Sequence, residues 1–89
     1  MTIDELRDKV RLMDADKAID IITEYIARHP SDDEAFLMRG LKYWGANKRA
    51  LAINDYLEAL RLNPDSRARQ ALAQANDILD FYNKDLYNP

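Results

Sequence analysis

The 89-residue chain contains no cysteine, only two glycines and three prolines, and a single histidine. The lack of cysteine excludes a disulfide framework and thiolate metal sites, and it fits a reducing compartment. Few glycines and prolines argue against a sheet-rich or disordered protein, and 47% of the residues are hydrophobic. We therefore expect one small, mostly helical domain, located in the cytoplasm.

A basic surface run and a long apolar stretch are also missing. The net charge is −3, and the longest basic run is the pair Lys48–Arg49, whereas a nucleic-acid interface needs a dense basic footprint. No apolar stretch approaches the roughly 20 residues that span a bilayer, and the acidic N-terminus does not resemble a signal peptide. We expect neither nucleic acid nor membrane as a partner.

The chain does contain apolar residues at helical spacing in five segments, each preceded by a capping signal. Residues 2–5 (Thr-Ile-Asp-Glu) and 31–34 (Ser-Asp-Asp-Glu) both read as capping boxes. The fourth helix is expected to run from about Lys48 to Leu62. The expected N-caps of the other helices are Asp14, Asn47 and either Asp65 or Ser66.

One helical pattern recurs with a shift of 34 residues. The residues Ala18, Ile19, Ile22, Ile26 and Pro30 are matched in size and polarity by Ala52, Ile53, Tyr56, Leu60 and Pro64. Thirty-four residues is the period of a helix–turn–helix unit that stacks into solenoids. Because one unit cannot bury its own apolar face, neighbouring units must stack, and stacked repeats present surfaces that bind partners.

The second unit carries a signature, aromatic…Gly-x-x-Tyr…Ala-x-x-x-aromatic…Pro, at Phe36, Gly40, Tyr43, Ala52, Tyr56, Ala59 and Pro64. This pattern resembles the tetratricopeptide repeat (TPR) family. Gly40 and Ala52 are small where the paired helices would cross closely. Arg39 stands where the family usually places Leu, so it either lays its methylenes on apolar neighbours or pairs with an acid.

The resemblance implies an all-α fold, with antiparallel helix–turn–helix repeats in a short right-handed solenoid of five helices. Within this single domain, residues 1–30 form a degenerate repeat and residues 31–64 the well-matched repeat. Residues 65–82 form a capping helix, and residues 83–89 a tail that could fold back onto it.

By the same resemblance, the function is non-catalytic: the concave surface binds a peptide or helix of a partner protein. The residues expected there are Arg7, Arg11, Leu37, Leu41, Trp44, Ala71, Ala75 and Ile78. Such a groove is apolar at its centre and basic on one flank, which suits a ligand with large side chains and some acids. Trp44 is either an anchor for this partner or core beneath the capping helix. The alternative function is a homo-oligomerising structural domain, for example a homodimer, that uses the same apolar surface.

Catalytic and metal sites are not expected. His29 precedes Pro30 at a helix C-terminus, where an imidazolium interacts well with the helix dipole. The acidic clusters lie at helix N-termini, where carboxylates cap free N–H groups. No nucleophile set, phosphate loop or metal-ligand motif is present in the sequence, so we expect no cofactor and no enzyme activity.

Overall fold

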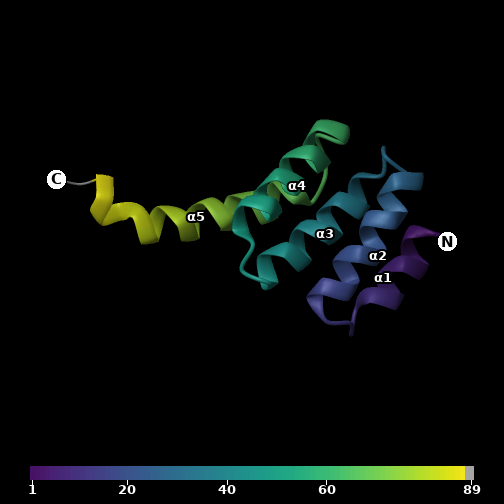
Figure 1. The fold of residues 1–89 in the computed structure, drawn as a ribbon. Helices are drawn as coiled ribbons and strands as arrows, with labels where there is room; N and C mark the ends of the chain where they lie inside the picture. Colours follow the sequence, from purple (N-terminus) through teal and green to yellow (C-terminus); the bar gives the residue numbers. More distant parts are fainter. Residues whose placement is uncertain (88–89) are drawn as a thin grey trace.

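A computed structural model describes the backbone of residues 1–87 and the side chains of residues 1–78. Over this part the chain forms five helices and no strand (Figure 1). The helices are α1 (Ile3–Val10), α2 (Ala15–Arg28), α3 (Asp33–Gly45), α4 (Arg49–Leu62) and α5 (Ala68–Tyr87). The predicted all-α fold class with five helices is confirmed.

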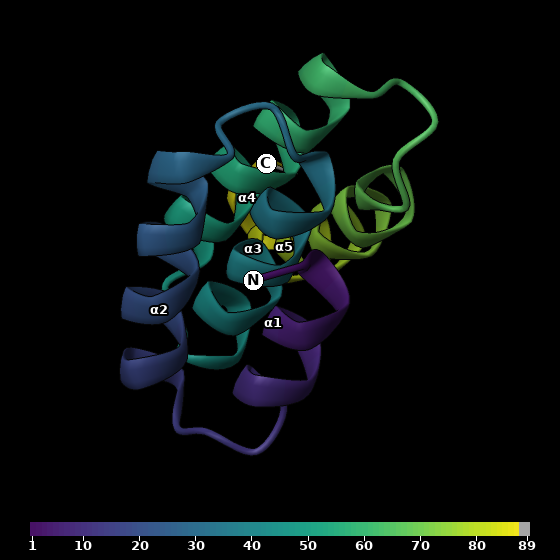
Figure 2. The same cartoon turned by 90° about the vertical axis from the view of Figure 1, so that its right-hand side faces the viewer.

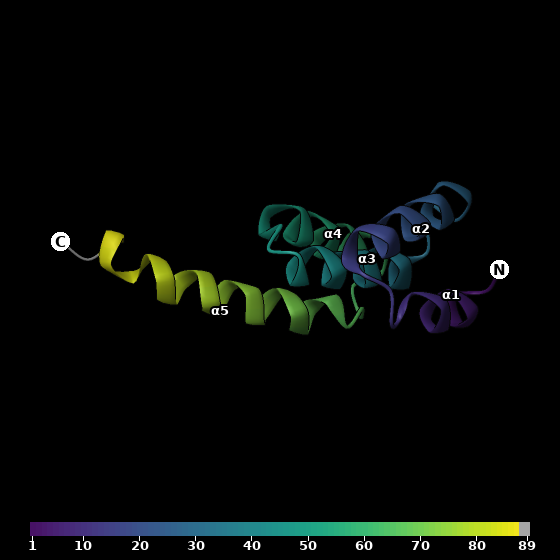
Figure 3. The ribbon, with the colours of Figure 1, turned by 60° about the horizontal axis from the view of Figure 1, so that its bottom comes forward.

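The helices are arranged on two sides of α3. Arg7 of α1 and Arg67, directly before α5, both contact Glu34 in the first turn of α3, so these three helices meet near the start of α3. Helix α4 runs opposite to α3, because Asp33 is bonded to Asn63 while Arg39 is bonded to Asp55. Figure 2 shows α2 on one side of α3 and α1 and α5 on the other. Figure 3 shows α5 continuing beyond the other helices.

Local capping explains where α1 and α2 begin. The Thr2 hydroxyl accepts a hydrogen bond from the Glu5 N–H (3.2 Å), and the Glu5 carboxylate accepts one from the Thr2 N–H (3.3 Å). The predicted capping box of α1 is therefore confirmed. Asp14 caps α2, as predicted, by accepting from the Lys17 N–H at 3.0 Å.

The predicted capping box at Ser31 is wrong. The N-cap of α3 is Asp32, whose Oδ1 accepts from the Glu34 N–H at 3.1 Å. The other carboxylate oxygen of Asp32 accepts a hydrogen bond from the Tyr25 hydroxyl of α2 at 2.7 Å. This tertiary contact favours Asp32 as the cap, and it leaves the Glu34 side chain available for contacts elsewhere.

Two other helix boundaries also differ from the expectation. Asn47 does not cap α4; it adopts a left-handed backbone conformation with φ of 62°, which asparagine tolerates in turns. Lys48 takes the N-cap position without a side-chain hydrogen bond. Helix α5 continues to Tyr87 instead of ending at residue 82. Residues 83–87 therefore belong to this helix and do not form the predicted tail that folds back onto it.

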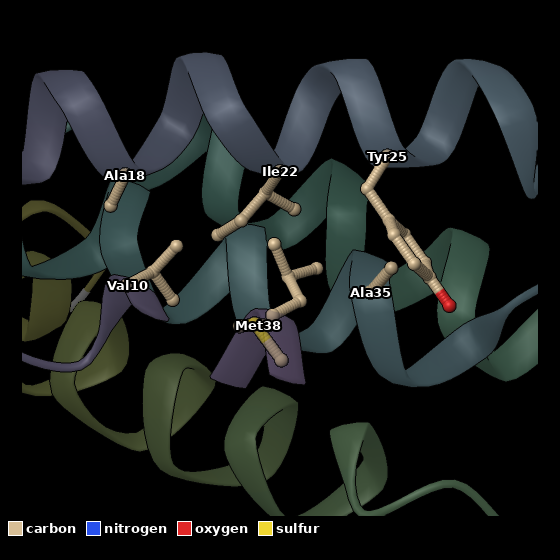
Figure 4. Close-up of a cluster of buried hydrophobic side chains, with 7 residues drawn as sticks. Val10, Ala18, Ile22, Tyr25, Ala35 and Met38 are labelled. Carbon is tan, nitrogen blue, oxygen red and sulfur yellow. The ribbon is translucent and has the colours of Figure 1, made fainter. Parts of the chain in front are cut away.

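The core consists of two clusters that share α3. The first lies between α1, α2 and α3, and Figure 4 shows its members pointing toward one another from these helices. They are Leu6, Val10, Ala18, Ile22, Tyr25, Ala35 and Met38. The second lies between α3, α4 and α5 and contains Leu37, Ala52, Tyr56, Ala59, Ala68 and Ala75. Helix α3 thus connects the two halves of the molecule.

Close packing of α3 on α4 depends on Gly40. A Cβ atom at this position would lie 2.6 Å from Cε1 of Tyr56 and 3.2 Å from the Ala52 carbonyl oxygen. Those distances are shorter than van der Waals contact, so only glycine lets the Tyr56 ring lie against the helix backbone. The reason given from sequence for a small residue at this position is therefore correct.

Arg39 connects three helices through polar contacts. Its Nε and Nη2 atoms each donate to a carboxylate oxygen of Asp55 at 2.8 Å, and Nη1 donates to the Thr23 hydroxyl of α2 at 3.2 Å. Its guanidinium carbon also lies 5.6 Å and 5.7 Å from the ring centroids of Phe36 and Tyr43. Of the two alternatives for Arg39, the structure has the ion pair with an acid.

Candidate functional site

Leu41 is the exposed apolar side chain at the middle of α3. It is 52% exposed, whereas Leu37, one turn earlier on the same helix, is only 4% exposed because it packs into the second cluster. Leu41 lines a hollow on each of its two sides. We refer to these two adjoining hollows together as the α1–α3–α5 groove.

The first hollow lies between α1 and α3. Its lining residues are Arg7, Val10, Arg11, Met38, Leu41 and Lys42. Val10 and Met38 are core residues whose edges form the apolar floor, while the three cations surround it. The hollow combines an apolar bottom with a positively charged rim on the α1 side.

The second hollow lies between α3 and the start of α5. Its lining residues are Leu37, Leu41, Arg67, Gln70, Ala71 and Gln74. Two of these are uncharged amides, which both donate and accept hydrogen bonds. Each hollow has a volume of about 280 Å³. That volume lies slightly below the range of about 300–1,000 Å³ for small-molecule sites, so each hollow suits a large side chain rather than a whole ligand.

An ion bridge closes one end of the groove. Oε2 of Glu34 accepts from Nη2 of Arg67 at 2.7 Å and from Nη2 of Arg7 at 3.2 Å. Arg7 also pairs with Asp4 at 2.7 Å. The hydrogen bond to Glu34 raises the pKa of Arg67 above its ordinary value, so this guanidinium stays charged. One carboxylate therefore connects α1 and α5 across the start of α3.

Two cations beside Leu41 have no such counter-ion. Arg11 and Lys42 form no ion pair or side-chain hydrogen bond with any residue whose side chain the structure describes. Arg11 is exposed and Lys42 is half-buried. Positive charge is thus concentrated on the α1 side of the groove, opposite the neutral amides of α5.

Five of the eight residues predicted from sequence line the groove: Arg7, Arg11, Leu37, Leu41 and Ala71. The other three do not line it. Trp44 is half-buried against the second cluster, with the Arg49 guanidinium carbon 5.0 Å from its ring centroid. Ala75 is buried in that cluster, and Ile78 is 38% exposed farther along α5.

Besides the core residues Val10 and Met38 on the floor of the first hollow, sequence reasoning missed five residues of this region: Glu34, Lys42, Arg67, Gln70 and Gln74. Helical spacing contained a signal for three of them. Lys42 lies one turn after Met38, and Gln70 and Gln74 flank Ala71 on the predicted fifth helix. Glu34 and Arg67 carried no such signal, because their meeting depends on how α3 and α5 pack.

The single histidine lies in a structural setting. His29 is the C-cap residue of α2, and its ring stacks on Tyr25 with centroids 4.3 Å apart. Burial and the nearby Asp32 carboxylate raise the pKa of Tyr25 to about 12, so its hydroxyl stays protonated and donates to that carboxylate. These contacts connect α2 to the start of α3.

The described residues contain neither a metal-binding cluster nor a membrane-spanning helix. The side chains of residues 1–78 include no group of three or more histidine or acidic residues placed to hold a metal ion. None of the helices in the described residues has the length and apolarity needed to cross a bilayer. Comparison with protein-family models, curated proteins and solved structures found no match to this chain.

Proposed function

We propose that the chain is a TPR-like, cytoplasmic interaction module that binds a peptide or helix of a partner protein in the α1–α3–α5 groove. Its role is non-catalytic, and it requires no cofactor. The observation that carries the proposal is the 52% exposure of Leu41 between two hollows that are lined by three different helices.

The helix arrangement supports the TPR-like part of the proposal. The antiparallel pairing of α3 with α4 supports a short right-handed solenoid. So do the common direction of α1, α3 and α5 (Figure 1) and the position of α1 and α5 on one side of α3 (Figure 2). In that arrangement the first helices of successive repeats line one surface. The groove lies on that surface.

The energetics also favour a peptide ligand. Covering a fully exposed leucine contributes about 1.5–3 kcal/mol, so covering the exposed half of Leu41 would contribute roughly 1 kcal/mol. A useful affinity therefore needs further side chains in the two hollows and polar contacts at their rims. A peptide can supply all of these together.

The test is selection of binders from an unbiased displayed library of peptides, followed by substitution of Leu41. Leu41→Ser should weaken binding of the selected peptides by about fivefold or more, because the central apolar contact is lost. Leu51→Ser is the matched control, since Leu51 is 45% exposed on α4 and lies outside both hollows.

Chemical shifts of the backbone amides locate the bound peptide. Perturbations on α1, α3 and the start of α5 would support the groove. If selected peptides instead perturb α2 and α4, or bind the Leu41 and Leu51 variants equally well, the proposal is wrong.

A second candidate function is homo-oligomerisation, which one observation favours. Helix α5 extends beyond the other helices, and Ile78, on the same stripe as the buried Ala75, is 38% exposed. A second copy could cover this stripe in a symmetric dimer. Sedimentation equilibrium should then show a reversible dimer that Ile78→Ser weakens, whereas a concentration-independent mass of 10.3 kDa would rule it out.

A further inference from the structure

The charge of the groove is opposite to that of the whole chain. The chain has a net charge of −3, yet four cations line the two hollows: Arg7, Arg11, Lys42 and Arg67. The acids bonded to these cations are Glu34, at the closed end, and Asp4, which pairs with Arg7. Asp77 lies about one turn beyond Gln74 on α5 and lines neither hollow. A basic face on an acidic protein selects partners by charge.

We propose, building on the function proposed above, that the groove binds an acidic peptide segment with large apolar residues. The apolar side chains cover Leu41 and enter the two hollows. Carboxylates lie on the α1 side, where they pair with Arg11 and Lys42.

Arg11 and Lys42 determine the charge preference of the groove, because neither is bonded to a side chain among the described residues. A carboxylate that approaches Arg11 or Lys42 replaces only water, because no described side chain is bonded to either cation. At Arg7 and Arg67 the same carboxylate would have to displace Glu34. Lys42 is half-buried beside Leu41, so an ion pair formed there is partly shielded from water and from salt.

The two sides of the groove also differ in charge. Arg11 and Lys42 line the hollow on the α1 side, whereas the α5 side has Gln70, Gln74 and Arg67. Arg67 is already paired with Glu34. An acidic segment bound with its carboxylates toward α5 would meet two neutral amides, the existing Arg67–Glu34 pair and, farther along the helix, Asp77. The carboxylates therefore favour one orientation of the ligand in the groove.

The experiment selects peptides from the unbiased displayed library against each of three proteins. It then compares the net charge of the peptides that each protein selects. The proteins are the wild type, Arg11→Glu/Lys42→Glu, and the control Lys17→Glu/Arg28→Glu. Both double variants change the net charge equally. All four substituted side chains lack ion pairs among the described residues, so neither variant breaks a bridge. Circular dichroism checks that each variant folds.

We expect Leu41-dependent peptides rich in Asp and Glu on the wild type and on the control. On Arg11→Glu/Lys42→Glu the selection should switch to basic peptides, and the acidic peptides should bind about tenfold or more weakly. Wild-type affinity for the acidic peptides should fall as salt is added.

The outcomes separate this inference from the function on which it rests. If the wild type selects neutral or basic peptides whose binding depends on Leu41, the groove binds partners but the acidic specificity is wrong. If the acidic peptides bind the Arg11→Glu/Lys42→Glu variant as well as the wild type, the assignment to these two cations is wrong. If no selected peptide depends on Leu41, both proposals fail.

Discussion

Gly40 and Gly45 are on the same helix in opposite surroundings. At Gly40 an added methyl group would overlap the Tyr56 ring and approach the Ala52 carbonyl, whereas at Gly45 nothing lies within 4 Å of it. Alanine is a better helix former than glycine by about 1 kcal/mol, so steric overlap decides the net sign. A residue type alone therefore does not predict the effect of its substitution here.

We predict opposite effects of one substitution at these two positions. Gly40→Ala should lower the free energy of unfolding by about 1–3 kcal/mol through overpacking. Gly45→Ala should leave it unchanged or raise it by up to about 1 kcal/mol. Urea denaturation measures both. Equal effects of the two substitutions would contradict the close approach of α3 and α4.

Tyr25 makes the free energy of unfolding depend on pH in the alkaline range. Burial and the Asp32 carboxylate raise its pKa to about 12 in the folded chain, from 10.0. The folded state thus favours the protonated hydroxyl, and this contribution is fully present below pH 10 and is lost as the pH rises toward 12. Burial also raises the pKa of Tyr56. Ionisation of Tyr56 therefore lowers the free energy of unfolding at alkaline pH as well.

The pH prediction compares the wild type with Tyr25→Phe. Between pH 10 and 12, the free energy of unfolding should fall more steeply for the wild type, because phenylalanine has no proton to lose. Urea denaturation at several pH values provides the comparison, and Tyr56 contributes equally to both proteins. Parallel curves would contradict both the burial of the Tyr25 hydroxyl and its hydrogen bond to Asp32.

At the scale of elements, the start of α3 is determined by a tertiary contact as well as by a cap. Asp32 both caps the helix and accepts the Tyr25 hydroxyl bond. We predict that Asp32→Ala lowers the free energy of unfolding by about 1–2 kcal/mol, whereas Ser31→Ala changes it by less than about 0.5 kcal/mol. Thermal denaturation of the two variants measures the difference. A larger effect at Ser31 would restore the capping box expected from sequence.

The Arg39–Asp55 pair connects α3 to α4, and Thr23 extends the network to α2. Arg39 is 18% exposed and Asp55 is 7% exposed, so water screens the pair only weakly. Removing one partner leaves a charge without its counter-ion, whereas replacing both with apolar residues removes the cost of burying charge.

We therefore predict that Asp55→Ala lowers the free energy of unfolding by about 2–4 kcal/mol. The double variant Arg39→Leu/Asp55→Leu should recover most of this loss, since two apolar residues remove both buried charges. Urea denaturation of both variants measures the effect. If the double variant is as unstable as Asp55→Ala, the network is required for helix packing rather than merely tolerated.

At the scale of the whole molecule, α3 joins both core clusters, so the two halves should unfold together. Ile22→Ala deletes a fully buried side chain of the first cluster and should cost about 2–5 kcal/mol. Trp44 is the single tryptophan and lies against the second cluster. In Ile22→Ala, the urea midpoint of unfolding should fall by the same amount whether it is followed by Trp44 fluorescence or by far-ultraviolet circular dichroism. Separate transitions would mean that the halves unfold independently.

Much of the fold could be predicted from local sequence, and less of the groove. The caps at Thr2 and Asp14 and the small residue at Gly40 were correct, because each depends on neighbours in sequence or on one helix pair. Leu41 and Arg11 were placed in the groove by helical spacing and resemblance. Trp44 could not be placed, since its stripe borders both the groove and the second cluster.

The sequence alone determined the helices, because apolar spacing and most of the capping signals act within a few residues. Only the tertiary structure decided which charges meet: Asp55 with Arg39, and Glu34 with Arg7 and Arg67. It also decided that Arg11 and Lys42 lie together beside Leu41. Those arrangements depend on how helices distant in sequence pack, and packing follows from the summed fit of many side chains rather than from any local pattern.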